Sequence, residues 1–144
     1  ARPYTLGPVF RIVNAETDGW AKNFPAGPGR PPFNTMAIID NEFASIYERW
    51  DIQHFEEGFS IRNVGTGYWL TARDGEVFGS SEFDQRESKW YIERAGDGVF
   101  TIKVPNQDTV MTALRKKAGY PISIFLEPAD GGDTQKWRLE RLDR

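Results

Sequence analysis

The sequence predicts an all-β fold made of three copies of one four-stranded unit. Apolar and polar residues alternate in short runs, as they do in half-buried strands. The 14 glycines and 9 prolines supply turns between these runs. A motif of aromatic residue, polar residue and isoleucine recurs three times, beginning at Phe10, Phe59 and Phe100. An internal repeat of this kind indicates that the copies share one local structure.

Each copy ends with a second motif: a tryptophan, any residue and a branched aliphatic residue. These closing tryptophans are Trp50, Trp90 and Trp137, spaced 40 and 47 residues apart. Ten residues after each opening phenylalanine stand Trp20, Trp69 and Val110, followed by Ala21, Leu70 and Met111. We therefore expect one domain, 1–144, with repeats at approximately 9–57, 58–97 and 98–144.

Four strands are expected in each copy. They start near Val9, Trp20, Met36 and Glu48, then Phe59, Tyr68, Glu76 and Lys89, then Val99, Thr109, Ile122 and Lys136. The turns between them are expected at Asp18-Gly19, Gly65-Thr66-Gly67, Asp74-Gly75, Gly96-Asp97-Gly98 and Gly131-Gly132-Asp133. The segment 42–49 is compatible with a helix, but the other copies have a loop at that place, so we expect a turn.

Three such units closed by Trp-x-Ile/Leu resemble a β-trefoil. One copy cannot bury its own aromatic face, so three would pack around a pseudo-threefold axis. The last copy ends Thr134-Gln135-Lys136-Trp137, which is similar to the Gln-x-Trp signature of ricin-B-like trefoils; its equivalents are Glu48-Arg49-Trp50 and Ser88-Lys89-Trp90. The motifs at 59–67 and 89–93 also resemble the mushroom trefoil proteins. That group includes ricin-B-like lectins and small cysteine-free protease inhibitors, so the resemblance implies a fungal origin and a role in defence.

Composition excludes several other classes. A net charge of −3 argues against binding to nucleic acid, and no apolar run is long enough to cross a bilayer. Without cysteine the chain has no disulfide, zinc ribbon or thiol nucleophile. We expect no metal or other cofactor, and a cytoplasmic location, with a secreted mature chain as the alternative. The expected state is a monomer or a small homo-oligomer.

Catalysis is not expected. His54, the one histidine, lies near the end of an expected strand beside Glu56 and Glu57. A solvated surface histidine is far more common than a general base without an identifiable nucleophile. We therefore predict a binding protein whose partner is a protease or a glycan.

The lectin hypothesis follows from the resemblance. In ricin-B-like lectins each competent copy offers an aspartate on the second strand, an aromatic ring, and an Asn or Gln near the Gln-x-Trp motif. Lys22, Thr71 and Thr112 stand where that aspartate is expected, so the usual hydroxyl acceptor is missing. The remaining candidate sugar contacts are Trp20, Asn23, Tyr68 and Trp69. Both tryptophans are exposed if Ala21 and Leu70 take the core positions; alternatively, their rings pack under neighbouring loops.

The inhibitor hypothesis rests on a proline-rich segment of the first copy. Its candidate protease-binding residues are Pro28, Gly29, Arg30, Pro31 and Pro32. Closely spaced prolines reduce the entropy of a loop and favour one extended shape, which a protease-inhibiting loop needs. Arg30 is the type of residue that enters the acidic pocket of a trypsin-like enzyme. In the inhibitors that the chain resembles, reactive residues lie on a loop of the first repeat; only that loop position is carried over. The alternative is a polyproline-like surface linker without a partner.

Overall fold

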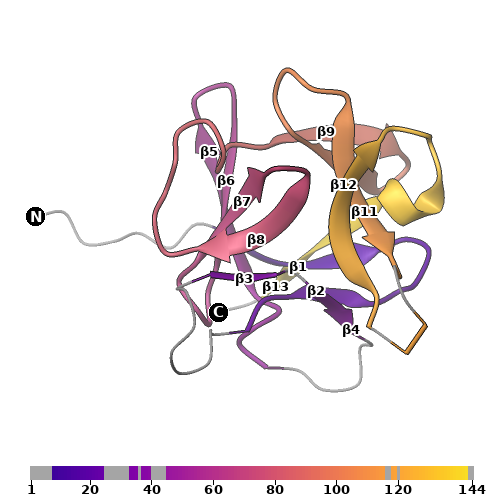
Figure 1. The fold of residues 1–144 in the computed structure, drawn as a ribbon, viewed down its shortest axis with the longest axis horizontal. Coiled ribbons are helices and arrows are strands. Elements are labelled where there is room, and N and C mark those ends of the chain that lie inside the picture. Colours follow the sequence, from indigo (N-terminus) through magenta and orange to yellow (C-terminus); the bar gives the residue numbers. More distant parts are fainter. Residues whose placement is uncertain are drawn as a thin grey trace, which may run out of the picture.

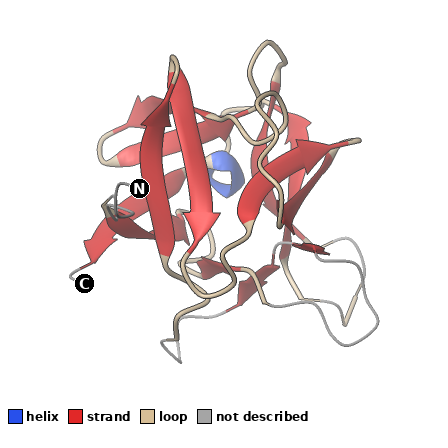
Figure 2. Ribbon diagram, turned by 90° about the vertical axis from the view of Figure 1, so that its left-hand side faces the viewer, coloured by secondary structure: helices blue, strands red, loops and turns tan. Residues whose placement is uncertain are grey.

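The structure, a computed structural model, describes residues 8–24, 33–35, 37–39, 45–115, 118–119 and 121–142. Its strands are β1 (Val9–Asn14), β2 (Trp20–Lys22), β3 (Phe33–Thr35), β4 (Ala37–Ile39), β5 (Trp50–Phe55), β6 (Gly58–Asn63), β7 (Trp69–Arg73), β8 (Glu76–Ser80), β9 (Tyr91–Gly96), β10 (Val99–Lys103), β11 (Thr109–Leu114), β12 (Ser123–Pro128) and β13 (Trp137–Leu142). One 3-10 turn, η1 (Asp133–Gln135), interrupts the strands (Figure 2). Within these ranges no helix is long and apolar enough to span a membrane.

Six strands close into a barrel. β1 lies between β13 and β5, and β5 pairs with β6. On the other side β13 pairs with β10, and β10 pairs with β9. The ring is completed by a bridge between Phe59 of β6 and Trp90, the residue before β9. Closure removes the free edges at which sheets otherwise associate.

The second and third strands of the copies cover one end of this barrel. β7 pairs with β8, β11 with β12, and β2 with β4 (Figure 1). These hairpins are also joined to one another, because β12 contacts both β8 and β4 while β3 pairs with β8. A six-stranded barrel capped by three hairpins is the β-trefoil fold that the sequence predicts.

The core uses the same positions in each copy. Its fully buried members include the motif isoleucines Ile12, Ile61 and Ile102 and the closing tryptophans Trp50, Trp90 and Trp137. They also include Ala21, Leu70 and Met111, which follow Trp20, Trp69 and Val110. The opening phenylalanines Phe10 and Phe59 are half-buried and pack against this cluster. Period-two alternation in the sequence therefore identified the inward face of the strands correctly.

Each closing tryptophan also makes one hydrogen bond that ties the barrel to the cap. The indole Nε1 of Trp50 donates to the carbonyl of Ala21 at 3.0 Å. Trp90 donates to Leu70 at 2.9 Å, and Trp137 donates to Met111 at 3.1 Å. The same side chain thus fills the core and satisfies a buried backbone acceptor in all three copies.

Most expected strand starts lie within two residues of the observed ones. The closing strands begin one or two residues later than expected, at Trp50, Tyr91 and Trp137. The strand expected at Met36 corresponds to β3 and β4 on either side of that residue, which itself lies outside the described residues. The described part of the ambiguous segment 42–49 is a turn, as expected. η1 was not predicted.

The turn signals are confirmed by backbone geometry at a hairpin that joins two strands of the second copy. Asp74 and Gly75 both have positive φ, 53° and 77°. This is the geometry of the two-residue hairpin turns that match strand twist, and glycine adopts it without steric cost. The dipeptide Asp-Gly therefore fixes the β7–β8 register locally.

Replacing Trp90 by Phe should destabilise the fold by about 2–4 kcal/mol, because it shrinks a fully buried side chain and leaves the Leu70 carbonyl without its donor. Urea unfolding followed by circular dichroism measures this change. Trp69→Phe is the matched control, since Trp69 is half-buried and its indole N–H donates to no residue in the described ranges. Equal losses in the two variants would contradict the role given to the indole hydrogen bond.

Candidate functional site

Neighbouring copies meet at three junctions, and two of these share one hydrogen-bonded arrangement. Asn14, at the end of β1, donates from Nδ2 to the carbonyl of Thr134 at 3.0 Å. Asn63, at the end of β6, donates in the same way to Tyr47 at 2.9 Å. Both side chains are fully buried, and each Oδ1 accepts two N–H groups of the turn that follows.

The residue after each asparagine adds a second bond across the junction. The N–H of Ala15 donates to the carbonyl of Lys136 at 2.9 Å, and the N–H of Val64 donates to Arg49 at 2.8 Å. These two bonds lock the first turn of one copy onto the residues before the closing tryptophan of the preceding copy. The first turn is therefore rigid at both junctions.

The junction between the second and third copies lacks both bonds. Val104 and Pro105 stand where the other copies have Asn14-Ala15 and Asn63-Val64. The valine side chain has no amide group to donate, and proline has no backbone N–H. The carbonyl of Lys89, which corresponds to those of Lys136 and Arg49, consequently has no such donor within the described residues. The two copies are less tightly joined here.

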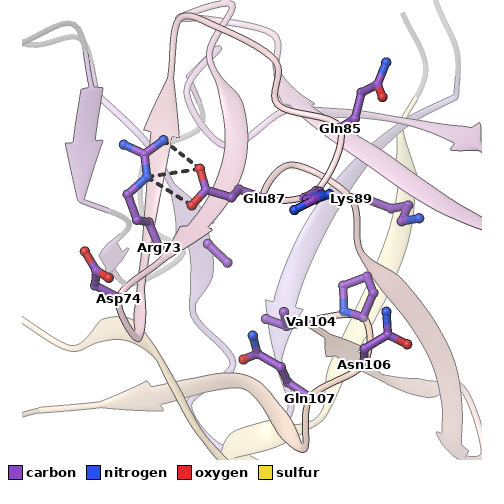
Figure 3. A pocket seen from close by; sticks show the side chains of 11 residues that line it. Arg73, Asp74, Gln85, Glu87, Lys89, Val104, Asn106 and Gln107 are labelled. Carbon is purple, nitrogen blue, oxygen red and sulfur yellow. Dashed lines mark hydrogen bonds and ion pairs between the residues drawn. The ribbon is translucent and has the colours of Figure 1, made fainter.

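A groove of about 480 Å³ lies at this junction. It is lined by Ala72, Arg73, Asp74, Gln85, Arg86, Glu87, Lys89, Val104, Pro105, Asn106 and Gln107. In Figure 3, Arg73 and Glu87 point toward each other on one side, and Asn106 and Gln107 come from the β10–β11 turn below them. The walls belong to two copies, so the fold rather than one motif creates the groove.

The groove wall is ordered by a two-point ion pair. Arg73 Nε lies 3.0 and 3.1 Å from the two carboxylate oxygens of Glu87, and Arg73 Nη2 lies 2.7 Å from Oε1. The Arg73 guanidinium also lies over the Phe78 ring, 5.3 Å from its centroid. The hydrogen bond from Arg73 to Glu87 raises the pKa of Arg73, so the guanidinium stays charged. Bidentate geometry fixes both side chains better than a single contact would.

The Lys89 ammonium at the rim of the groove is held by two carboxylates. It lies 2.8 Å from Glu57 and 3.1 Å from Glu56, and the Tyr91 hydroxyl donates to Glu57 at 2.9 Å. The hydrogen bond from Lys89, assisted by a backbone N–H and by Tyr91, lowers the pKa of Glu57 from 4.5 to about 2. The same contacts raise the pKa of Lys89 and of Tyr91.

The groove offers closely spaced donors and acceptors with little unbalanced charge. Amide groups of Gln85, Asn106 and Gln107 are neutral, and Arg73 is paired with Glu87. Such a surface suits a ligand whose neighbouring groups both donate and accept hydrogen bonds. Among the residues described here, no cluster of His, Asp or Glu could hold a metal ion.

The candidate tryptophans are half-buried, and each has an arginine over its ring. The guanidinium carbon of Arg11 lies 3.9 Å from the Trp20 ring centroid. That of Arg62 lies 4.7 Å from the Trp69 centroid, and the Phe83 ring packs edge-on against Trp69 at 5.0 Å. These cation–π contacts occupy ring surface that a sugar would need for stacking.

The other two candidate sugar residues differ in their burial. Tyr68 is half-buried and precedes Trp69. Asn23 is fully buried, and its Oδ1 accepts a hydrogen bond from the Thr66 hydroxyl at 3.2 Å. A Cβ on Gly79 would lie 2.4 Å from this Oδ1, so glycine is required for the packing. The Asn23 amide is therefore part of the protein interior.

The positions of the missing lectin aspartate are also interior. Lys22, Thr71 and Thr112 are all buried. The Thr71 hydroxyl lies 3.0 Å from the Ser88 hydroxyl, and Gln135 Nε2 donates to the Thr112 hydroxyl at 3.2 Å. In the second and third copies these groups thus hydrogen-bond to the residue two places before the closing tryptophan.

The candidate protease-binding residues, Pro28 to Pro32, lie outside the described residues. The described residues on both sides of them are anchored. The Phe24 ring packs on Tyr47 with centroids 5.4 Å apart, and Phe33–Thr35 pairs with Phe78–Ser80 of β8. Ten residues separate β2 from β3, whereas two separate β7 from β8. His54, by contrast, is exposed and stacks on Phe59 at 4.7 Å, in no catalytic arrangement with the described residues.

The groove residues were missed by sequence reasoning, although a signal for them exists. Aligning the three copies on their opening phenylalanines shows Val104-Pro105 against two Asn-containing turns. That difference predicts a loosened junction. The identity of the opposite wall, Arg73 and Glu87, follows only from the hairpin geometry, since these residues lie fourteen positions apart.

No protein-family model matches the sequence, and no curated protein matches it. Several solved structures have the same fold. ThreeFoil, a designed threefold-symmetric protein, is 15% identical over 93% of this chain and 99% of its own, with a TM-score of 0.78. A ricin B-like lectin from Macrolepiota procera, in complex with lactose, is 16% identical over 98% of this chain and 100% of its own, with a TM-score of 0.74. A proteinase inhibitor from Coprinopsis cinerea is 11% identical over 96% and 100%, with a TM-score of 0.76.

These likenesses establish the fold: the chain is a β-trefoil protein built from three copies. Trefoils similar to it include a lectin and a protease inhibitor, the two kinds that the sequence resemblance names. The fungal origin implied by that resemblance stays a prediction.

Glu57 should make stability depend on acidity. Its folded pKa of about 2 lies below the ordinary 4.5, so its contribution is complete above pH 4.5 and is lost as the pH falls toward 2. Thermal melts of Glu57→Gln between pH 2 and 7 should show a shallower acid limb than the wild type. Glu93→Gln is the control, because the Glu93 carboxylate forms no ion pair within the described residues. An unchanged acid limb in Glu57→Gln would show that the cluster does not affect folding.

Proposed function

We propose that the protein is a non-catalytic β-trefoil that inhibits a serine protease through the proline-rich segment of its first copy. Arg30 enters the acidic primary pocket of a trypsin-like enzyme. The restricted backbones of Pro28, Pro31 and Pro32 favour an extended segment on both sides of it, and Gly29 is the remaining contact residue.

The observation that carries this proposal is the insertion between two anchored strands. Ten residues connect β2 to β3 in the first copy, where the second copy has a two-residue turn. The Phe24–Tyr47 ring contact and the β3–β8 pairing fix the described residues at its ends. A short segment held at both ends loses little entropy when it binds, which favours tight association.

Proline at position 31 supports inhibition over cleavage. Pro31 follows Arg30 directly and has no N–H. A peptide bond to proline is held poorly for nucleophilic attack, so the segment would occupy the protease cleft and be cut slowly. The protein therefore acts as a competitor of the protease's substrates.

Arg30→Ala should weaken inhibition of trypsin about ten- to a hundredfold, because it removes one charge-assisted contact worth roughly 1.5–3 kcal/mol. Arg30→Leu should shift preference toward chymotrypsin. Inhibition constants against both enzymes, with the melting temperature as the folding control, test this. A wild-type protein that leaves trypsin-, subtilisin- and papain-like proteases unaffected at micromolar concentration would contradict the inhibitor proposal.

The second candidate function, carbohydrate binding, is favoured by the groove between the second and third copies. Sugar hydroxyls both donate and accept hydrogen bonds, as the lining of this groove does. The groove contains no aromatic ring, and the Trp20 and Trp69 rings are covered by arginines. The ligand would accordingly be held by polar contacts along its edge rather than by stacking.

Asn106→Gly should weaken glycan binding about tenfold without destabilising the fold. Asn106 has a φ of 62°, a conformation that glycine adopts freely, so only the amide is lost. A glycan array followed by calorimetry on the best ligand measures the effect. Asp18→Gly, with a φ of 58° at another junction, is the matched control. Equal affinity in wild type and Asn106→Gly would exclude the groove as the sugar site.

A further inference from the structure

The junction between the first and second copies carries an apolar counterpart of the groove. Phe24 lies four residues after Trp20, as Arg73 lies four after Trp69. Tyr47 precedes its closing tryptophan by three residues, as Glu87 does. The Phe24–Tyr47 ring contact at 5.4 Å therefore stands in the first copy where the Arg73–Glu87 ion pair stands in the second.

Three exposed apolar side chains gather at this place. Phe24, Ile46 and Val64 are 40%, 52% and 42% exposed, and the described residues contain no other large hydrophobic side chain with this exposure. Tyr47 connects them, because its ring contacts Phe24, its neighbour is Ile46, and its carbonyl accepts from Asn63, the residue before Val64. We call Phe24, Ile46, Tyr47 and Val64 the first-junction patch.

The patch is presented on rigid backbone. The buried carboxylate of Glu48 accepts both the N–H and the hydroxyl of Ser45, closing a tight turn with Ile46 at its tip. A Cβ on Gly65 would lie 2.6 Å from the Tyr47 ring and 2.9 Å from the Ile46 carbonyl, so the next copy packs directly beneath this turn. Side chains held in this way lose little freedom when a partner covers them.

The fold does not require apolar side chains at these positions. The places of Ile46 in the other copies are taken by Arg86 and Asp133, and those of Val64 by Ala15 and Pro105. Since the other copies carry charged or smaller side chains at these positions, the repeated fold does not require the exposed apolar surface. Grouped exposed apolar residues of this kind mark protein contact sites.

We propose that the first-junction patch is a second contact surface for the protease that the proline-rich segment inhibits, an inference that rests on the proposed function. Phe24 is joined directly to Pro25, and the Phe24–Tyr47 ring contact places the turn that carries Ile46 beside this end of the inserted stretch. A protein bound to that segment would also contact the first-junction patch. The matching surface is an apolar rim beside the protease cleft, because the patch offers rings and aliphatic groups and no charge.

Ile46→Arg and Val64→Ala test this by giving each position the kind of residue that an equivalent turn carries. Each change should raise the inhibition constant for trypsin, with Ile46→Arg raising it about tenfold or more, because it places a charge in a desolvated contact. Asp133→Asn is the matched control, since it changes net charge equally at the equivalent turn of the third copy. Unchanged melting temperatures would show that the variants fold.

The possible results are distinct. A raised constant for Ile46→Arg and Val64→Ala, with Asp133→Asn unchanged, supports the proposal. If Arg30→Ala loses inhibition while both patch variants keep it, the patch is no contact surface and the proposed function stands. A wild type that does not inhibit trypsin removes the proposed function and this inference with it. A wild-type dimer in light scattering that Ile46→Arg converts to monomer shows a second copy on the patch and overturns the inference.

Discussion

The indole N–H of each closing tryptophan bonds to a carbonyl on the second strand of the same copy, at 2.9–3.1 Å in all three copies. The tryptophan stands in the barrel wall and the carbonyl in the cap, so this bond sets the distance between the two layers. It also fixes the residues just before the tryptophan, which form the junctions. A buried donor and acceptor are expensive to separate, so the arrangement tolerates change only in the side chains around it.

Those surrounding side chains differ in each copy. The residue two places before the closing tryptophan is Glu48, Ser88 or Gln135, and all three are buried. Each of these side chains hydrogen-bonds within the protein: Glu48 to Ser45, Ser88 to Thr71 and Gln135 to Thr112. Thr71 and Thr112 lie on the second strands of their copies. Interior polar groups satisfied in this way are not offered to a ligand. The side chains available to a ligand are therefore those at the surface of the junctions. One junction presents the rings of Phe24 and Tyr47, and another presents the Arg73–Glu87 ion pair.

The fold and most of the core could be predicted from sequence because repeated isoleucine and tryptophan positions report burial directly. The exposure of Trp20 and Trp69 could not be predicted from the sequence, because the arginines over their rings come from the neighbouring strands β1 and β6. Asn23 is typical of a surface polar residue in sequence, yet Gly79 opens space for it inside the protein. Predicting the groove requires two features together: Val104-Pro105 in place of an Asn-containing turn, and the geometry of the β7–β8 hairpin. A single stretch of sequence contains only one of these features.

The missing bonds at Val104 and Pro105 also have a mechanical consequence. The other two junctions are each stitched by an asparagine amide and a following N–H, whereas the contact between the second and third copies has neither among the described residues. Local opening that separates neighbouring copies therefore costs the least free energy at this junction. Backbone amides at this junction should thus exchange with solvent ahead of global unfolding, and separation of the two copies would widen the groove.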